Sequence, residues 1–247
     1  MMQLEIQALS QIGLVRDNNE DMVSLGGILL RDDTMSLPPI HLNEESQFYL
    51  LVADGMGGHE YGERASQGLL EHLDQCFKEG LLKADTFEDD LRFQVKSFSD
   101  KLNRQAREEG QLRPMGCTLT GVVWSHGKAY LLNAGDSRTY RYRDGILRQL
   151  TQDETLRGLT GNPNESKALL NCIGGSAEGE LTVVDFTERL YTGDTLLVCS
   201  DGLTDMLSDE EIEQILSEPV LPVDDLYEAA CEKGGTDNVS IILAKLI

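Results

Sequence analysis

The sequence predicts an α+β fold, a central β-sandwich of two antiparallel sheets flanked by α-helices. Helical segments cluster between the strand-like segments instead of alternating with them one for one. Several neighbouring strand-like segments are joined by turn signals, such as Asp144-Gly145, that favour hairpins. A parallel sheet would need a long crossover between its strands. The 247 residues contain no internal repeat, low-complexity tract or linker-like stretch, so one domain over residues 1–247 is expected.

Three segments carry the signals of helices. In 62–80 and 87–110 the apolar residues recur every three or four positions, so each helix presents one apolar face. Both segments end at a glycine, as helices commonly do. The third segment, 208–217, begins with Ser208 and Glu211 at the spacing of a capping box.

Most of the remaining chain is typical of β-strands, because short apolar or alternating segments are bounded by turn residues. The expected strands are 47–53, 117–125, 128–134, 137–143, 180–186, 194–200 and 238–247. The long stretch 28–46 contains Pro38-Pro39 and is expected to form an exposed loop.

The composition excludes several classes of protein. No run of about 18 apolar residues is present, so no membrane insertion is expected. The N-terminal segment lacks the basic start and apolar centre of a secretory signal, and the five scattered cysteines include no C-x-x-C pair. These features predict a cytoplasmic protein with reduced thiols. The net charge of −22 argues against nucleic acid as a partner, because phosphates would be repelled.

Four predicted strands carry an aspartate at one end, beside glycine or another small residue. These aspartates are Asp54, Asp136, Asp201 and Asp237. An unpaired carboxylate costs several kcal/mol to bury, so four at strand ends suggest one shared positive charge. Oxygen ligands of this kind suit Mg²⁺ or Mn²⁺.

Other motifs near these acids help to define the chemistry. No histidine or cysteine has zinc-site spacing, since His59-Glu60 lacks the second histidine of H-E-x-x-H. The glycine-rich stretch around His59 also fails the dinucleotide-binding pattern. Near the N-terminus, Arg16 precedes Glu20-Asp21, and its guanidinium offers a fork that matches phosphate oxygens. An oxyanion-binding arginine beside a metal site is therefore expected.

Seven motifs occur in order along nearly the whole chain: RDNNED, VADGMGGH, GCTLTGVVW, NAGDSRTY, LTQDE, VCSDGLTD and GGTDNVSIIL. In these the chain resembles the type 2C (PPM) metal-dependent protein phosphatases of the compact bacterial kind. The resemblance implies a β-sandwich flanked by helices, in agreement with the strand pattern. It also implies two or three Mn²⁺ or Mg²⁺ ions in each site.

The resemblance assigns roles to the aspartates that end the strands. Asp54 matches the residue that bridges two metals, and the carbonyl of Gly55 matches a ligand of the second metal. Asp201 and Asp237 match the carboxylates that complete the first metal site. Asp136 matches the aspartate that bacterial members use for a third metal.

The resemblance also covers residues near both ends of the chain. Glu20 and Asp21 match acids that hold the second metal, directly or through water. Arg16 matches the arginine that grips the substrate phosphate, and Asn238 matches a residue that lines the site.

The implied activity is hydrolysis of phosphoserine and phosphothreonine in proteins, by attack of a metal-bridging water or hydroxide. By this resemblance, the residues expected to carry that catalysis are Arg16, Asp54, Asp201 and Asp237. The expected partners are phosphoproteins, a cognate bacterial Ser/Thr kinase and its targets, and the protein is expected to be a monomer. The alternatives are a catalytically silent pseudophosphatase that acts as a binding module and a two-metal nuclease. The complete set of aspartates disfavours the first, and the net charge of −22 disfavours the second.

Two departures from the family pattern leave details open. Met56 occupies the position where animal members carry a histidine often assigned as general acid. His59 or a metal-bound water could take that part. Glu154 replaces a common histidine, and the flap that follows it is short, at about 153–171. The effect of both changes on specificity is not predicted.

Overall fold

The fold is seen in a computed structural model, which describes all residues except 1, 58–59, 112–113 and 219. Two six-stranded sheets form its centre, and every pair of neighbouring strands within them is antiparallel. The first sheet has the order β11 (Ile146–Gln149), β10 (Arg138–Arg143), β14 (Thr195–Cys199), β15 (Val239–Leu246), β1 (Met2–Gln11), β4 (Asp33–Leu42). The second has the order β13 (Thr182–Asp185), β9 (Lys128–Ala134), β8 (Leu119–Ser125), β5 (Phe48–Ala53), β2 (Met22–Leu25), β3 (Ile28–Leu30).

The other elements lie around these two sheets. A small third sheet joins β12 (Ile173–Gly174), β7 (Gly116–Cys117) and β6 (Gly55–Met56). The α-helices are α1 (Glu60–Lys78), α2 (Phe87–Glu108), α3 (Leu156–Thr160), α4 (Asp201–Thr204), α5 (Asp209–Leu216) and α6 (Val223–Glu232). Short 3₁₀ turns span Ala84–Thr86 and Thr187–Arg189. None of the described helices is long and apolar enough to cross a membrane.

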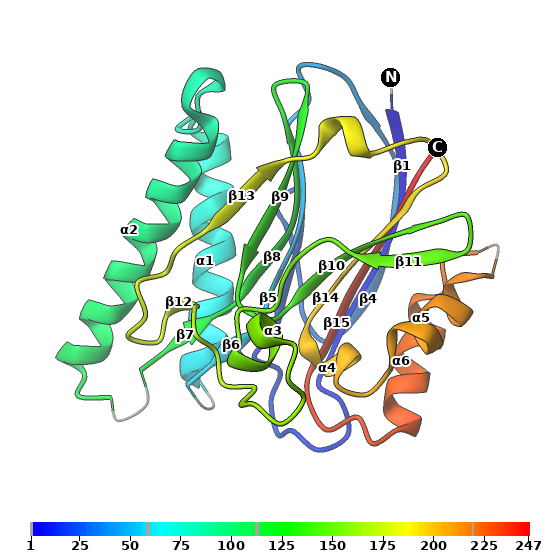
Figure 1. The fold of residues 1–247 in the computed structure, drawn as a ribbon. Helices are drawn as coiled ribbons and strands as arrows, with labels where there is room; N and C mark the ends of the chain where they lie inside the picture. Colours follow the sequence, from blue (N-terminus) through cyan, green and yellow to red (C-terminus); the bar gives the residue numbers. More distant parts are fainter. Residues whose placement is uncertain (1, 58–59, 112–113, 219) are drawn as a thin grey trace.

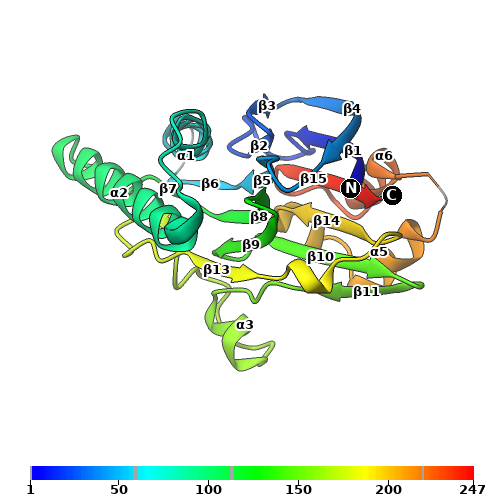
Figure 2. The ribbon, with the colours of Figure 1, turned by 90° about the horizontal axis from the view of Figure 1, so that it is seen from above.

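The elements stack in four layers, with the two sheets in the middle (Figures 1 and 2). Helices α1 and α2 cover the second sheet, whereas α4, α5 and α6 lie against the first. The central strand β5 shows why its sequence is apolar throughout. Leu50 and Val52 point between the sheets, whereas Tyr49 and Leu51 point toward α1 and α2. Both faces of this strand are buried, so it lacks the alternation of a half-exposed strand.

The predicted α+β sandwich is confirmed by this architecture. Helices α1 and α2 occupy the segments in which apolar residues recur every three or four positions, and they bury Leu69, Leu73, Leu91 and Val95. Helix α5 begins with the predicted capping box, in which Ser208 and Glu211 each bond the backbone of the other.

The expectation of an exposed loop at 28–46 was wrong. Residues Ile28–Leu30 form β3, and residues Asp33–Leu42 form β4, which pairs with β1 at the edge of the first sheet. The prolines fit because Leu4 faces Ile40 and Ile6 faces Leu37, which places Pro38-Pro39 in a bulge. Proline lacks an N–H donor, so an edge strand with a bulge is where a sheet tolerates it.

Candidate active site

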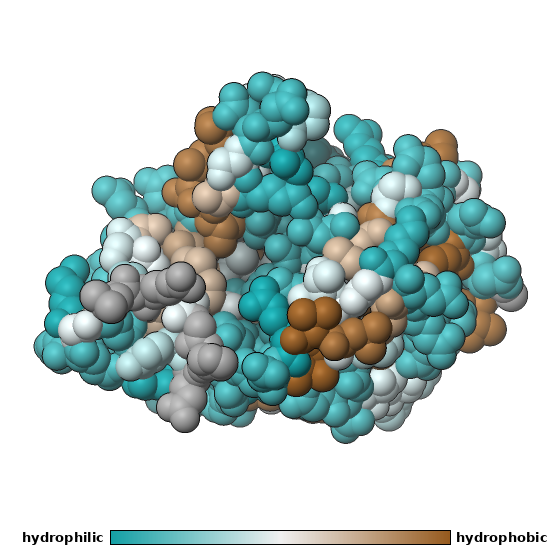
Figure 3. Space-filling model, turned by 90° about the horizontal axis from the view of Figure 1, so that it is seen from below, coloured by the Kyte–Doolittle hydropathy of each residue, from teal (hydrophilic) through white to brown (hydrophobic). Residues whose placement is uncertain are grey.

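The four aspartates that end strands meet at one edge of the sandwich. Asp54 follows β5 and Asp136 follows β9, both of the second sheet. Asp201 follows β14 and Asp237 precedes β15, both of the first sheet. All four line one cavity of about 710 Å³. Figure 3 views the molecule from below, where polar side chains cover most of the surface between small apolar patches.

The structure brings most of the predicted site residues to this cavity. Those that line it are Arg16, Glu20, Asp54, Gly55, Asp136, Asp201, Asp237 and Asn238. Asp21 does not line the cavity and is a buried residue, 1% exposed, but its charge acts on Asp54. The proposed general acid His59 lies outside the described residues.

The carboxylates of the cavity repel one another. Burial raises the pKa of Asp54 well above its ordinary value, and the charges of Asp21 and Asp201 add to the increase. Burial, with neighbouring acids, also raises the pKa of Asp201 and of Asp136 to about 7. The pKa of Asp21 rises to about 6, mainly through burial, although the hydroxyls of nearby serines oppose the increase. The cluster therefore needs positive charge to be fully ionised at neutral pH.

The donor set fits divalent metal ions. Neither carboxylate oxygen of Asp21 has a hydrogen bond of ordinary geometry, although both are buried. Such orphaned, charged oxygens among other carboxylates are the ligands that Mg²⁺ and Mn²⁺ prefer. Among the described residues, no group of three or more aspartate, glutamate, histidine or cysteine side chains is already arranged to hold a metal ion. The site therefore has the carboxylate ligands that a divalent metal ion needs, and these side chains would move closer together around a bound ion.

Arg16 lies at the mouth of the cavity on a turn held by the backbone. The N–H of Leu14 donates to the carbonyl of Gly235 at 2.8 Å, which ties the turn to the segment before β15. The Arg16 guanidinium donates to Asp237 at 2.5 Å, while half of the Arg16 side chain remains exposed. This hydrogen bond raises the pKa of Arg16. Arg16 is thus already held among the acids, with donors left to face an incoming anion.

Glycines beside the aspartates allow the backbone segments of the site to approach closely. A Cβ on Gly55 would lie 2.3 Å from the carbonyl oxygen of Gly62 and 2.5 Å from that of Glu20. A Cβ on Gly202 would lie 1.9 Å from the carbonyl oxygen of Asn238. Only glycine can therefore follow Asp54 and Asp201 without moving the neighbouring backbone.

Gly202→Ala is expected to destabilise the protein by about 3 kcal/mol, because the new methyl group must push β15 away from α4. Urea unfolding measures this change. Gly80→Ala is a suitable control, since a Cβ there meets nothing within 4 Å and costs only the strain of its φ of +65°. Equal losses in the two variants would show that the contact with Asn238 is unimportant.

Sequence reasoning missed several residues that shape the cavity. Lys167, on the flap, lines it and forms an ion pair with Asp205, just after α4. The hydroxyl of Thr118 accepts a hydrogen bond of 3.0 Å from the N–H of Asp54. Glu154, whose part was not predicted, accepts hydrogen bonds from the N–H of Gly135 and the amide of Asn171. Glu154 thereby fastens the flap to the strand end that carries Asp136.

The fold is a sandwich of two antiparallel sheets between helices, and a cluster of carboxylates suited to divalent metals lies at one edge of it. Together these features place the chain in a class of metal-dependent proteins. Residues 27–233 match the family model described as Protein phosphatase 2C. The chain belongs to the protein phosphatase 2C family.

Curated relatives and solved structures agree with this assignment. The chain is 34% identical over 251 residues to the serine/threonine phosphatase stp of Listeria monocytogenes, covering 94% of this chain and 92% of the relative. It is also 34% identical over 261 residues to PstP of Mycobacterium tuberculosis, covering 99% of this chain and 45% of the relative.

Two solved structures share the fold. A Streptococcus agalactiae serine/threonine phosphatase has a TM-score of 0.80 at 26% identity, over 98% of this chain and 99% of that one. The catalytic domain of PstP, in complex with two manganese ions, has a TM-score of 0.76 at 32% identity, over the full length of both chains.

Proposed function

We propose that this protein is a metal-dependent serine/threonine phosphatase, which removes phosphate from phosphoserine and phosphothreonine in proteins. The observation that carries the proposal is the cluster of buried acids with raised pKa values, which shares its cavity with Arg16. Membership of the family and the two manganese ions of the PstP catalytic domain support it. We assign the activity to a single catalytic domain over residues 1–247.

The acids would hold the metals and Arg16 would hold the substrate. When bound, two divalent cations supply Lewis acidity and lower the pKa of a shared water toward about 7. Asp54 would contribute to both ions, Asp201 and Asp237 to the first, and the carbonyl of Gly55 to the second. Arg16 would turn from Asp237 to the equatorial oxygens of the phosphate, where charge is neutralised during transfer.

The remaining acids would complete the ion sites. Glu20 and Asp21 would serve the second ion, directly or through water, and Asp136 with Asp201 would serve a third. Both Glu20 and Asp136 line the cavity, in keeping with these roles. Asn238 would help to fix the backbone that carries Glu20. Its side chain accepts from the N–H of Glu20 and donates to the carbonyls of Ile12 and Asn18.

Phosphoproteins are the proposed partners, with a cognate bacterial Ser/Thr kinase and its targets among them, and the proposed location is the cytoplasm. The net charge of −22 favours phosphorylated segments with basic neighbours over nucleic acid. A silent pseudophosphatase is the alternative, and the presence of Asp54, Asp136, Asp201 and Asp237 in one cavity speaks against it.

Hydrolysis of a phosphothreonine peptide and of an aryl phosphate, in Mn²⁺, Mg²⁺ or chelator, tests the proposal. Turnover of both substrates that requires the metal is expected. Metal binding without turnover of either substrate would overturn the enzymatic function and favour the binding module.

Arg16→Ala is expected to raise KM for the phosphopeptide by about 10- to 100-fold, because hydrogen bonds to a charged group contribute about 1.5–3 kcal/mol. Steady-state kinetics at saturating Mn²⁺ measures this change. Arg64→Ala is the matched control, since Arg64 is similarly exposed and pairs with Glu109, just after α2 and away from the acids. A KM that stays unchanged in Arg16→Ala would exclude Arg16 from phosphate binding.

A further inference from the structure

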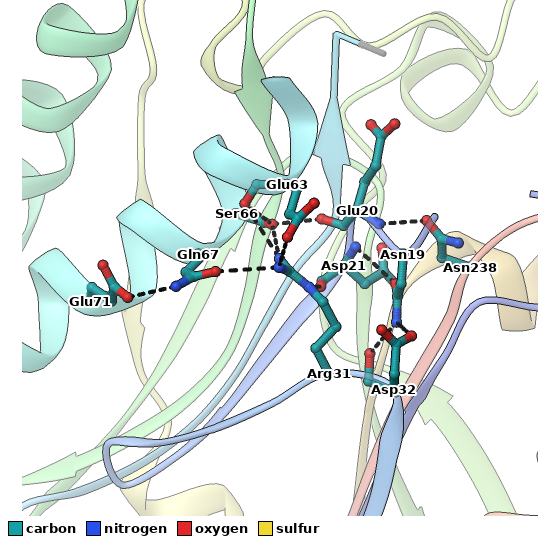
Figure 4. A network of polar contacts seen from close by, with 11 residues as sticks. Asn19, Glu20, Asp21, Arg31, Asp32, Glu63, Ser66, Gln67, Glu71 and Asn238 are labelled. Carbon is teal, nitrogen blue, oxygen red and sulfur yellow. Dashed lines mark hydrogen bonds and ion pairs between the residues drawn. The ribbon is translucent and has the colours of Figure 1, made fainter. Parts of the chain in front are cut away.

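Three consecutive residues of the acidic segment before β2, Asn19, Glu20 and Asp21, are held by contacts from several elements. Two of these residues, Glu20 and Asp21, are proposed to serve the second metal. Figure 4 shows the polar contacts around them, which come from α1, from the loop between β3 and β4, and from the start of β15. Metal affinity depends strongly on such supporting contacts, because they fix where the ligand oxygens point.

Arg31 lies at the centre of this network. Its Nε donates to the carbonyl of Asp21 at 2.8 Å, and its Nη1 donates to the carboxylate of Glu63 on α1 at 2.8 Å. Its Nη2 donates at 3.3 Å to the carbonyl of Glu63 and to the hydroxyl of Ser66. The Arg31 side chain is only 13% exposed. One planar guanidinium thus joins the acidic segment to α1.

Two neighbours of Arg31 hold the remaining residues of the segment. The hydroxyl of Ser66 donates to the carbonyl of Glu20 at 2.6 Å. The carboxylate of Asp32 accepts from the side-chain amide of Asn19 at 3.1 Å, and Asn19 in turn accepts from the N–H of Asp21. Asp32 reaches this position with a φ of 56°, an uncommon conformation for a residue other than glycine. The loop between β3 and β4 is therefore shaped to hold Asn19 and Asp21, on either side of Glu20.

We infer that Arg31 is a positioning residue for the second metal site, which holds the Glu20–Asp21 segment against α1 so that Glu20 lines the cavity and the buried Asp21 lies close enough for its charge to act on Asp54. The inference rests on the proposed function, since it assigns these acids to a metal. The partner of Arg31 on the acidic segment is the carbonyl of Asp21, a backbone atom. Arg31 also does not line the cavity that holds the acids. Its effect on the reaction would pass through the position of that segment and through the charge that it places near Asp21, and Arg31→Lys, which keeps the charge, separates the two.

The test is Mn²⁺ binding to the full chain, measured by electron paramagnetic resonance, together with the Mn²⁺ dependence of aryl phosphate hydrolysis. In Arg31→Gln the weaker class of Mn²⁺ sites is expected to lose about 10- to 100-fold in affinity. The Mn²⁺ concentration for half-maximal rate should rise in parallel, while the rate at saturating Mn²⁺ recovers. Arg31→Lys, which keeps the charge but loses the fork, should fall between wild type and Arg31→Gln.

Arg143→Gln is the matched control. Arg143 also joins a carboxylate to a carbonyl, those of Asp194 and Arg189, but these partners lie outside the acidic segment 19–21. Its loss should lower the melting temperature without moving Mn²⁺ affinity. Ser66→Ala removes the bond to the carbonyl of Glu20, together with the longer contacts of the hydroxyl with Arg31 and the carbonyl of Glu63. It leaves the bond of Arg31 to the carbonyl of Asp21 in place and gives a second, milder variant that tests the same segment.

The outcomes separate this inference from the proposed function. Unchanged Mn²⁺ affinity in folded Arg31→Lys and Ser66→Ala, or an equal loss in Arg143→Gln, would overturn the positioning role. Absence of turnover in the Mn²⁺-loaded wild type would overturn the phosphatase function. The binding measurement on Arg31 variants would still decide the positioning role in that case, because it does not depend on turnover.

Discussion

Asp201→Asn is expected to reduce kcat/KM for a phosphothreonine peptide by at least about 10²–10³-fold, even at saturating Mn²⁺. The change removes a single negative charge without altering the shape of the side chain. Asp201 stands where β14 gives way to α4, close to Asp54 and Asp237. The loss should therefore come from weaker metal binding and not from unfolding.

The melting temperature of Asp201→Asn shows whether its loss of activity comes from weaker metal binding or from unfolding. Burial and neighbouring acids raise the pKa of Asp201 to about 7, so its ionised form is unfavourable in the metal-free protein. Asp201→Asn should accordingly unfold at a higher temperature than wild type in chelator at pH 8. Asp100→Asn removes the same charge on α2, where Asp100 pairs with Lys96 away from the cavity, and is the control for activity. Full activity in Asp201→Asn would contradict the metal role of this residue.

The metal-free protein is expected to lose stability as the pH rises from 5 to 8. The folded-state pKa is about 6 for Asp21 and about 7 for Asp136 and Asp201, above the ordinary value of 3.8. A carboxyl with a raised folded-state pKa contributes full stability below its unfolded pKa and loses it as the pH rises through the folded pKa. The summed loss should be a few kcal/mol, which lowers the melting temperature by roughly 10 °C.

Thermal unfolding in chelator at several pH values measures this loss, and addition of Mn²⁺ should reverse it. Binding at about 100 times the dissociation constant contributes about 2.7 kcal/mol to the free energy of unfolding. Asp54→Asn removes an acid whose pKa is raised well above its ordinary value and whose charge acts on its neighbours, so it should flatten the pH dependence in chelator. A metal-free protein that is equally stable at pH 5 and pH 8 would contradict the mutual repulsion of the acids.

Much of the fold could be predicted because its signals are local. Helical spacing of apolar residues located α1 and α2, and the Ser208 capping box located the start of α5. The strand β4 could not be predicted, because only pairing with β1 makes it a strand. Its exposed residues and Pro38-Pro39 are typical of a loop until the sheet edge and its bulge are known.

The site was predictable to the extent that its residues carry chemistry at recognisable positions. The aspartates next to buried strands were found in this way, and the structure places Asp54, Asp136, Asp201 and Asp237 on one cavity. Their individual metal roles stay predictions. Arg31 gave no such signal, since an arginine followed by two aspartates gives no sign of burial. Its partner Gln67 lies 36 residues further along the chain, so only the folded structure reveals the network.

The position of β15 between β14 and β1 has a consequence for how the protein folds. The hydroxyl of Ser240 on β15 bonds that of Ser10 on β1 across 230 residues of sequence, and Arg16 reaches Asp237 across 221. Closing such long loops is slow and entropically costly. Asp237 can join the other acids only after β15 has inserted between β14 and β1, so tight Mn²⁺ binding during refolding should appear with the kinetic phase in which β15 inserts. The time course of Mn²⁺ binding during refolding would therefore report when this step is complete.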